Sequence, residues 1–512
     1  MARLNLLVVM ADQLTPSVLG CYGGQAVTPT IDGLAARGVR FDAAYCASPL
    51  CAPARFAFMS GRLISNIGAW DNAAYLPSLV PTFAHYLRAM GYRTCLSGKM
   101  HFVGPDQLHG FEERLTTDVY PADFGWVPDW REPEARIDLW YHNMSSVKQA
   151  GVAAITNQLA YDDEVTAASL RWLYDAARNP DDRPFCHVAC FIHPHDPYAA
   201  RRRYWDLYDG VEIDPPRTPR PDPAANDPHS LRLERAIALD AADVTGEDVA
   251  RARRAYHANV SYVDEQVGRL IAVLEETGRI DDTAILVLSD HGDMLGERGL
   301  WYKMSLYEPS ARIPMILAVP GADGGRVERA PVSQIDVLPT LLALAADGRD
   351  DAAPEIIDPL DGVSLVGSAD PERCVAVEYT AEAALAPILM LRRGAWKYTA
   401  SPADPEQLFD LDADPQEVTN RADDPTAAEV LADFRARAAA HWNAEAVNRD
   451  VLTDQRRRRL LTQALESGRG ASWDYQPPRD AAEEYTRSHM ELSDFDARAR
   501  WPRPPAFEPD WR

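Results

Sequence analysis

Long apolar runs and clustered positive charge are both scarce in this chain of 512 residues. The apolar runs, such as 6–11 and 284–288, are too short to cross a bilayer, so we expect no membrane association. Lys and Arg number 52 against 77 Asp and Glu, which gives a net charge of −25. Phosphate neutralisation needs clustered cations, so this balance argues against a nucleic-acid-binding protein. It is compatible with a cationic small-molecule ligand, although an acidic surface also serves solubility.

Cysteine and lysine are also few. The seven cysteines are odd in number and scattered, which favours free thiols in a reducing compartment over a disulfide framework. Residues 1–3 lead directly into a strand-like run, so we expect no cleavable leader and a cytoplasmic protein. Only four of the 52 cations are lysines, which indicates either positions that need a compact ammonium or chance. They are Lys99, Lys148, Lys303 and Lys397.

The order of apolar patterns predicts the fold class. Strand-like runs alternate with amphipathic segments over the first 345 residues, which is typical of an α/β fold with a large, mostly parallel sheet flanked by helices. Later segments predict short antiparallel strands at 375–379, 388–392 and 396–399, a helix at 426–440 and a charged helical tail. We therefore expect a large N-terminal domain over 1–370, a smaller C-terminal α+β domain over 371–445 and a tail over 446–512. Within the tail, the four arginines at 456–459 are interpreted as a solvated helix face or a subunit contact.

Four polar clusters follow directly after predicted strands. In open parallel sheets, ligands bind outside the carboxyl ends of the strands, so neighbouring strands would point all four clusters into one crevice. A single Asp after a strand is usually a turn or cap residue, but four such clusters favour a site. The clusters are Asp12-Gln13 after strand 4–10, Lys99-Met100-His101 after 93–96, His193-Pro194-His195-Asp196-Pro197 after 184–192, and Asp290-His291-Gly292-Asp293 after 284–288.

The residue types in this crevice indicate a metal and an anion. Asp12 and Asp290 offer hard oxygen ligands, and Gln13 and His291 add neutral ones, a set that suits one divalent cation. A cation ringed by basic side chains is the equipment for handling a sulfuryl or phosphoryl group. The side chains expected around the anion are Arg55, Lys99, His101, His195 and Lys303.

Cys51 is the candidate nucleophile. It opens a predicted short helix, with Pro53 suited to the first turn and residues 60–62 ending it. A helix N-terminus favours an anion and lowers a thiol pKa, although a lone Cys is more often a small buried hydrophobe. The sequence Cys51-x-Pro53-x-Arg55 resembles the signature of the sulfatases, a family in which this Cys is oxidised to formylglycine.

The resemblance extends over essentially the whole chain, which is identified as a member of the choline sulfatases within the alkaline phosphatase superfamily. Unlike many sulfatases, it has Asp12-Gln13 in place of Asp-Asp and Asp290-His291 in place of Asp-Asn. Choline sulfatases and phosphonate monoester hydrolases share these forms. The other similar segments are Lys99-x-His101, Pro194-His195-x-Pro197 and the stretches 69–74, 102–114, 121–126, 140–143, 296–303, 406–411, 473–477 and 485–492.

This resemblance implies hydrolysis of choline O-sulfate to choline and sulfate. Formylglycine at Cys51, hydrated to a gem-diol, is implied to attack sulfur and form a sulfated enzyme, from which the second hydroxyl expels sulfate. The wider family implies Ca²⁺, while a His ligand also suits Mn²⁺. The implied metal ligands are Asp12, Gln13, Cys51, Asp290 and His291, and the implied catalytic residues are Cys51, Arg55, Lys99, His101, His195 and Lys303.

A quaternary ammonium has no N–H donors, so its recognition requires aromatic faces and carboxylates. If a tail carboxylate comes from a neighbouring subunit, oligomerisation completes the pocket. The resemblance also implies a homotetramer of paired dimers and a formylglycine-generating enzyme as the maturation partner. The implied substrate-binding residues are Asn72, Trp126, His142, Asn143, Glu378 and a tail carboxylate, Asp494 or Glu491.

Two alternatives remain open. A phosphonate or phosphate ester hydrolase would use the same centre without a cation pocket, and would keep its activity after Trp126→Ala and Glu378→Ala. A non-catalytic binder of choline sulfate or another anion is a different class, and the full set of nucleophile, metal and acid candidates argues against it. Conversion of Cys51 to the aldehyde separates an enzyme from a binder.

Overall fold

The computed structural model describes residues 3–120, 123–131, 142–178, 181–346 and 354–467. All of these lie in a unit that spans Met1–Ala471, and the second unit, Ser472–Arg512, lies outside the described residues. The tail candidates Glu491 and Asp494 are therefore outside the description. Among the described helices, none has the length and apolarity to cross a bilayer.

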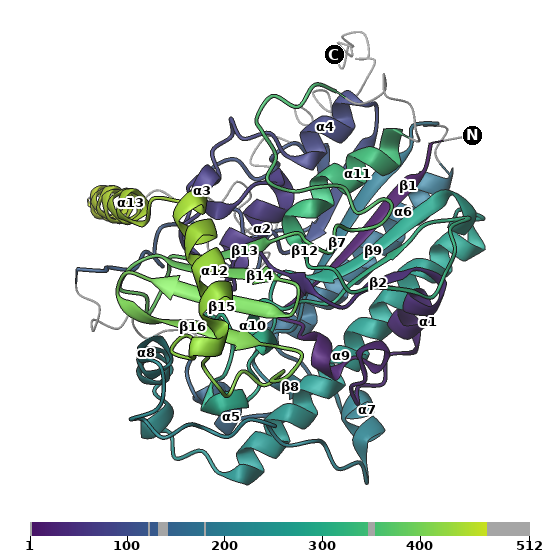
Figure 1. Cartoon of the computed structure of the whole chain (residues 1–512). Coiled ribbons are helices and arrows are strands. Elements are labelled where there is room, and N and C mark those ends of the chain that lie inside the picture. Colours follow the sequence, from purple (N-terminus) through teal and green to yellow (C-terminus); the bar gives the residue numbers. More distant parts are fainter. Residues whose placement is uncertain (1–2, 121–122, 132–141, 179–180, 347–353, 468–512) are drawn as a thin grey trace, which may run out of the picture. The chain divides into compact units, whose positions relative to one another are not determined.

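A large sheet forms the centre of the described unit (Figure 1). Its strands are β1 (Asn5–Asp12), β2 (Val39–Phe41), β4 (Arg93–Gly98), β5 (Glu113–Arg114), β7 (Phe185–Pro194), β9 (Thr283–Ser289), β10 (Met315–Ala318) and β11 (Arg326–Glu328). Their order is β11-β2-β10-β9-β1-β7-β4-β5, and β10 alone runs antiparallel to its neighbours. Every residue of β1, β7 and β9 is buried, which explains their continuous apolar sequences. The predicted α/β fold is confirmed.

Two groups of helices cover this sheet (Figure 1). The long helix α9 begins at a capping box, in which the side chains of Thr245 and Asp248 accept each other's backbone N–H. The first group contains α1 (Pro29–Arg37), α5 (Ser145–Lys148), α6 (Asn157–Arg178), α7 (Arg202–Trp205) and α9 (Gly246–Glu276), and the second contains α2 (Cys51–Ser60), α3 (Ile64–Ile67), α4 (Phe83–Ala89) and α11 (Val337–Ala346).

A second, antiparallel sheet follows in the chain. Its strands pair in sequence order, and α12 (Ala428–His441) packs on it around Phe434 and Tyr398 (Figure 1). The predicted short strands and helix of this region are therefore present, while the domain boundaries at 370 and 445 stay a prediction. The strands are β13 (Val375–Tyr379), β14 (Ile388–Arg393), β15 (Trp396–Ser401) and β16 (Asp404–Asp410).

The remaining elements connect these layers. The strand pairs β3 (Ala44–Tyr45) with β12 (Val332–Ser333), and β6 (Gly151–Val152) with β8 (Ala199–Ala200), are parallel. The other helices are α8 (Pro228–Ala236), α10 (Glu308–Ala311) and α13 (Ala444–Glu466).

Candidate functional site

The four predicted polar clusters meet at one edge of the central sheet. Strands β9, β1, β7 and β4 are adjacent and parallel, so their carboxyl ends lie together. One ligand atom from each of four buried residues lies within 4.8 Å of the others. These residues are Asp12, Cys51, Asp290 and His291.

Cys51 is the first residue of α2, a helix whose ten residues are all buried and which ends at Gly61 in the left-handed conformation. Its Sγ lies 3.2 Å from His291 Nε2 and 3.9 Å from Asp12 Oδ1. Burial alone raises a thiol pKa, but Lys303, Lys99 and His291 hold the pKa of Cys51 well below its usual value. The predicted nucleophile therefore lies in a buried and electropositive place.

Two basic side chains balance the carboxylates of this cluster. Arg55 donates from Nη2 to Asp12 Oδ2 and from Nε to Asp290 Oδ2, each at 2.9 Å. The ammonium of Lys99 also donates to Asp12 Oδ2. Burial raises the pKa of Asp12, yet Lys99, His195 and Arg55 outweigh it and hold the pKa below its ordinary value. Asp12 is therefore held as a carboxylate, the kind of hard ligand that a divalent cation requires.

Gln13 lies between the metal-ligand candidates and Lys303. Its backbone N–H donates to Asp290 Oδ1 at 3.0 Å, and its amide donates to Asp293 Oδ2 at 2.7 Å. Its amide oxygen accepts from Lys303 Nζ at 2.7 Å. The proposed metal ligation by this oxygen stays a prediction.

His195 and Lys303 form a buried pair, with Lys303 Nζ 2.8 Å from His195 Nε2. The other ring nitrogen of His195, Nδ1, lies 2.8 Å from the Asp196 carbonyl. Asp196 also pairs with His142, whose Nδ1 lies 3.1 Å from Asp196 Oδ1. Burial and Lys303 together lower the pKa of His142 to about 4, so this ring is neutral at pH 7.

Aromatic rings form a wall beside these groups. Trp126 stands edge-on to Tyr120 and to His101, with ring centroids 5.3 and 5.7 Å away. The ammonium of Lys99 lies 4.5 Å from the centre of the Tyr120 ring. The rings of His142 and Tyr302 are 4.8 Å apart. Two further binding candidates, Trp126 and His142, therefore lie beside the predicted catalytic residues.

The remaining predicted binding residues have structural contacts of their own. Asn72 Oδ1 accepts the backbone N–H of Ala52, the second residue of α2, at 3.0 Å. Asn143 Oδ1 accepts the N–H of Ser145 at the start of α5, at 2.9 Å. Glu378 accepts from the N–H and Oγ of Ser65 and lies 2.8 Å from His441 Nε2, so both of its oxygens are engaged.

Glu382 is a carboxyl that the sequence reasoning missed. It is 5% exposed, and its Oε2 has no hydrogen-bond partner among the described residues. Burial, with a smaller contribution from the Asp71 charge, raises the pKa of Glu382 to about 8 although Lys303 opposes the rise. A buried carboxyl with an unused oxygen, close enough to Lys303 and Cys51 for their charges to act on its pKa, is better suited than Glu378 to face a cation. Only its position four residues after Glu378 could have drawn attention to it.

Backbone strain is concentrated in this site. Gln13, His101, Tyr302 and Met304 all have φ between 61° and 70°, which is unfavourable for residues other than glycine. Hydrogen bonds fix each of them; for example, the N–H of His101 donates to Asp118 Oδ2 at 2.7 Å. The sequence carries no signal for this strain.

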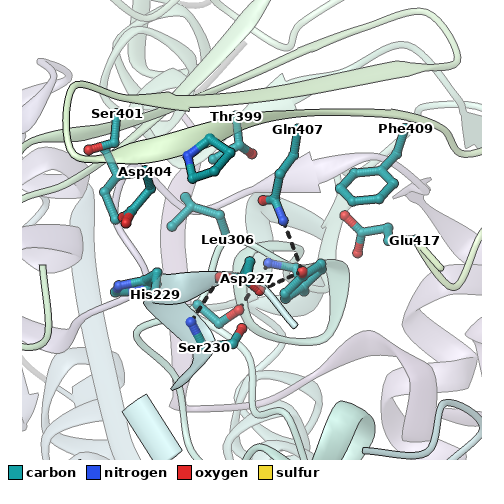
Figure 2. Close-up of a pocket in the computed structure, with 14 residues that line it drawn as sticks. Asp227, His229, Ser230, Leu306, Thr399, Ser401, Asp404, Gln407, Phe409 and Glu417 are labelled. Carbon is teal, nitrogen blue, oxygen red and sulfur yellow. Dashed lines mark hydrogen bonds between the residues drawn. The ribbon is translucent and has the colours of Figure 1, made fainter. Parts of the chain in front are cut away.

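A cavity also lies between the C-terminal sheet and α8 (Figure 2). Figure 2 shows Gln407 and Phe409 on one wall of this cavity and Asp227, His229 and Ser230 on the facing wall, with Leu306 between them. Its volume of about 30 Å³ is room for a water molecule rather than a substrate. The cluster around Cys51 is therefore the better candidate for the functional site.

Comparisons with known proteins agree with this geometry. The sulfatase family model matches residues 4–347, the model of the choline sulfatase C terminus matches 449–501, and that of the N-sulphoglucosamine sulphohydrolase C terminus matches 296–443. The chain is 49% identical over 509 residues to the choline-sulfatase of Rhizobium meliloti (strain 1021), which covers 98% of both chains. It is 30% identical to the uncharacterized sulfatase YidJ of Escherichia coli (strain K12), over 84% of this chain and 85% of that one.

A solved structure supports the fold. The phosphonate monoester hydrolase of Agrobacterium radiobacter superposes with a TM-score of 0.66 at 23% identity, covering 86% of this chain and 95% of that one. This likeness shows the alkaline phosphatase-like fold. The family match over residues 4–347 and the similarity to the choline-sulfatase over 98% of both chains show that the chain belongs to the sulfatase family and is a sulfuric ester hydrolase.

Proposed function

We propose that this enzyme hydrolyses choline O-sulfate to choline and sulfate, with residue 51 acting as formylglycine. The observation that carries the proposal is the position of Cys51: its Sγ lies within reach of Asp12, Asp290 and His291, beside a wall of aromatic rings. The similarity to the Rhizobium meliloti choline-sulfatase supports choline as the alcohol part.

The donor set fits one divalent cation. Asp12, Asp290, His291 and residue 51 would hold it, and it would supply Lewis-acid polarisation of the nucleophile and charge compensation for the sulfate. Two carboxylates favour Ca²⁺, and the His nitrogen also suits Mn²⁺. Gln13 is proposed as a further ligand.

Residue 51, oxidised to formylglycine and hydrated, would supply the attacking oxygen and a second hydroxyl that lets sulfate depart without water attacking sulfur. Arg55 and Lys99 provide fixed positive charge toward the anion. Burial lowers the pKa of His101, and neither ring nitrogen has a hydrogen-bond partner among the described residues. A neutral His101 is therefore suited to accept the proton of that second hydroxyl.

Choline is a poor leaving group, so its oxygen needs a proton. Lys303 is buried and donates to Gln13 and His195, which uses two of the three ammonium protons. The third is available to the leaving oxygen, with His195 beside it as the second candidate.

The other half of the pocket would hold the trimethylammonium group. Trp126 and Tyr120 offer ring faces, His142 is neutral, and Glu382 offers the carboxyl. Asn72 anchors this half to α2, next to residue 51. Asn143, Glu378 and the tail residues Asp494 and Glu491 stay predictions for this half.

Two further proposals rest on the family resemblance. A formylglycine-generating enzyme would mature Cys51, and the chain would assemble as a homotetramer of paired dimers. The cytoplasmic location is proposed on another ground, the seven scattered cysteines. Size-exclusion chromatography with light scattering tests the assembly.

The alternative is a phosphonate or phosphate ester hydrolase with the same centre, which the likeness to a phosphonate monoester hydrolase favours. Sulfate and phosphate groups have similar size and shape, so the anion half of the site cannot separate them. The part of the site that would bind the cation distinguishes the two substrate classes, because a phosphonate ester without a cation would gain no affinity from Trp126 or Glu382.

The test begins with protein co-expressed with a formylglycine-generating enzyme. Peptide mass spectrometry across Cys51 is expected to show the aldehyde, and the same batch is expected to release choline and sulfate, with Cys51→Ala inert. Hydrolysis by protein whose Cys51 remains a thiol would refute the formylglycine nucleophile. Turnover of phosphonate esters without turnover of choline sulfate would favour the alternative.

A further inference from the structure

The arginine run at 456–459 is only partly solvated. Arg456 and Arg457 are exposed, as the run of charge predicted, but Arg458 is 3% exposed. Arg458 donates through Nη1 and Nη2 to the two carboxylate oxygens of Asp71, at 2.5 and 2.7 Å. Its Nε donates to Asp454 at 2.7 Å. A bidentate arginine–carboxylate pair of this kind fixes direction as well as distance.

Asp71 belongs to the segment that carries Asn72. It is fully buried, and its Oδ1 also accepts the N–H of Ala73 at 3.0 Å. The next residue, Asn72, accepts the N–H of Ala52 on the nucleophile helix. Arg458 is therefore separated from the site only by Asp71 and the segment that Asp71 orders.

A second group of contacts joins α13 to the aromatic wall. Gln455, 1% exposed, accepts the backbone N–H of Trp130 through Oε1 at 3.1 Å, and Arg459 pairs with Asp129. The Trp130 indole in turn donates to the Ala381 carbonyl at 3.1 Å, next to Glu382. One helix thus holds the segments that carry Asn72, Trp126 and Glu382.

The anion half of the site is held by different elements. Asp12 is the last residue of β1, Asp290 directly follows β9, and Arg55 on α2 joins them. These supports are the central sheet and the nucleophile helix.

We infer that Arg458 and Gln455 are positioning residues that give the site its selectivity for a cationic alkyl sulfate over a sulfate ester without a cation. Arg458 acts through Asp71 in two ways. It orients the 71–72 segment, and it neutralises a carboxylate whose charge already acts on Glu382. Gln455 acts through Trp130 on the segments of Trp126 and Glu382. The inference rests on the proposed function, because the cation is that of choline.

The experiment compares kcat/KM for choline O-sulfate with kcat/KM for 4-nitrophenyl sulfate, using the full chain matured at Cys51. We expect Arg458→Met to lower the ratio of the two values by about 10- to 100-fold, mainly through a higher KM for choline sulfate. Gln455→Leu is expected to lower the same ratio. Arg456→Met is the matched control, because Arg456 is exposed on the same helix, and its ratio should equal that of the wild type.

Arg458→Met leaves Asp71 buried without its partner, so folding is checked by circular dichroism and thermal unfolding. Arg458→Lys keeps the charge but loses the bidentate geometry, and it is expected to give an intermediate ratio. An unchanged ratio in folded Arg458→Lys and Gln455→Leu, or an equal fall in Arg456→Met, would overturn the inference. Wild-type protein that fails to hydrolyse choline sulfate would instead refute the proposed function.

Discussion

The ammonium nitrogen of Lys303 lies 2.8 Å from Nε2 of His195, inside a site where both side chains are 1% exposed. An ammonium can only donate, so Lys303 donates to Nε2, and Nδ1 of the same ring faces the Asp196 carbonyl at 2.8 Å. Together with the contact to Gln13, this arrangement leaves one ammonium proton of Lys303 for the proposed leaving oxygen. The contribution of this pair to kcat is therefore expected to be larger for an ester whose leaving group needs a proton.

Replacement of Lys303 by Met tests this role. We expect kcat for choline sulfate to fall by about 10²- to 10⁴-fold, the usual contribution of general acid catalysis. The fall for 4-nitrophenyl sulfate is expected to be much smaller, because 4-nitrophenolate is stable without protonation. His195→Ala should likewise lower kcat more for choline sulfate than for 4-nitrophenyl sulfate. Equal losses for the two esters would contradict a proton-donating role and indicate damage to sulfate binding.

Removal of the metal is the second test. Without a cation, Asp12 and Asp290 keep Arg55 and Lys99 as partners, so we expect the protein to stay folded after dialysis against a chelator. Its activity is expected to fall by about 100-fold or more and to return when Ca²⁺ or Mn²⁺ is added. Because the cation binds the folded state, the midpoint of thermal unfolding should rise with its concentration.

The control for this test is the metal content of variants. Elemental mass spectrometry should find one metal ion per wild-type chain. The metal content should be lower in the Asp290→Asn and His291→Ala variants. Full activity in wild-type protein that carries far less than one cation per chain would exclude the metal from the reaction.

The site could be predicted from the sequence where it depends on strand ends. Asp12, Lys99, His195 and Asp290 each stand at or directly after a buried apolar run, and the parallel order β9-β1-β7-β4 brings them together. A continuous apolar run has few places in a folded chain other than the core. The core strands were therefore also predicted to within a few residues. β16 was missed, because its sequence begins with Asp404-Pro405 and ends with Asp410.

Other parts of the site depend on contacts between distant residues, which no local sequence pattern indicates. Glu378 and Glu382 are four residues apart, and only the fold decides which carboxyl is engaged by Ser65 and His441 and which keeps an oxygen without a partner. Arg458 looks like its neighbours in the run, yet its partner Asp71 is 387 residues away. Side chains that are ordered by distant segments need the structure to be identified.

The pKa of Glu382 leads to a prediction about pH. Its raised value of about 8 means that the carboxyl is neutral at lower pH and charged above it. The groups that act on it are Asp71, which raises the pKa, and Lys303, which lowers it, with a smaller rise due to Cys51. A carboxylate attracts the trimethylammonium group and a neutral carboxyl does not, so kcat/KM for choline sulfate should rise as pH increases through about 8.

The variant Glu382→Gln tests this dependence. It should lose the rise near pH 8 and show a KM for choline sulfate about 10-fold higher at pH 9, since a lost charge attraction of about 1.4 kcal/mol is tenfold in affinity. Hydrolysis of 4-nitrophenyl sulfate serves as the control, because that ester has no cation. A rise near pH 8 that persists in Glu382→Gln would assign the titration to another group.

Lys397 is the subject of the last prediction, and it concerns stability. It is 1% exposed, and its Nζ lies 3.0 Å from Glu308 Oε1 and 2.7 Å from Glu417 Oε1, next to the cavity of Figure 2. Glu308 belongs to α10 and Lys397 to β15, so this ammonium joins the first part of the chain to the C-terminal sheet. Lys99 and Lys303 are buried in the same way, so three of the four lysines serve as compact internal cations.

Lys397→Met removes the cation that Glu308 and Glu417 share, so we expect a loss of about 3–5 kcal/mol in the free energy of unfolding. The matched control is Lys148→Met, whose pair with Asp248 is 38% exposed on the lysine side and should be worth about 1 kcal/mol or less.

Burial and Glu308 already raise the pKa of Glu417, and loss of Lys397 removes the charge that opposes this rise. A carboxyl with a raised folded-state pKa takes up a proton more readily when folded, so the variant should recover stability as pH falls. Urea unfolding midpoints at several pH values measure both effects, and a loss no larger than that of Lys148→Met would show that the network contributes nothing to stability.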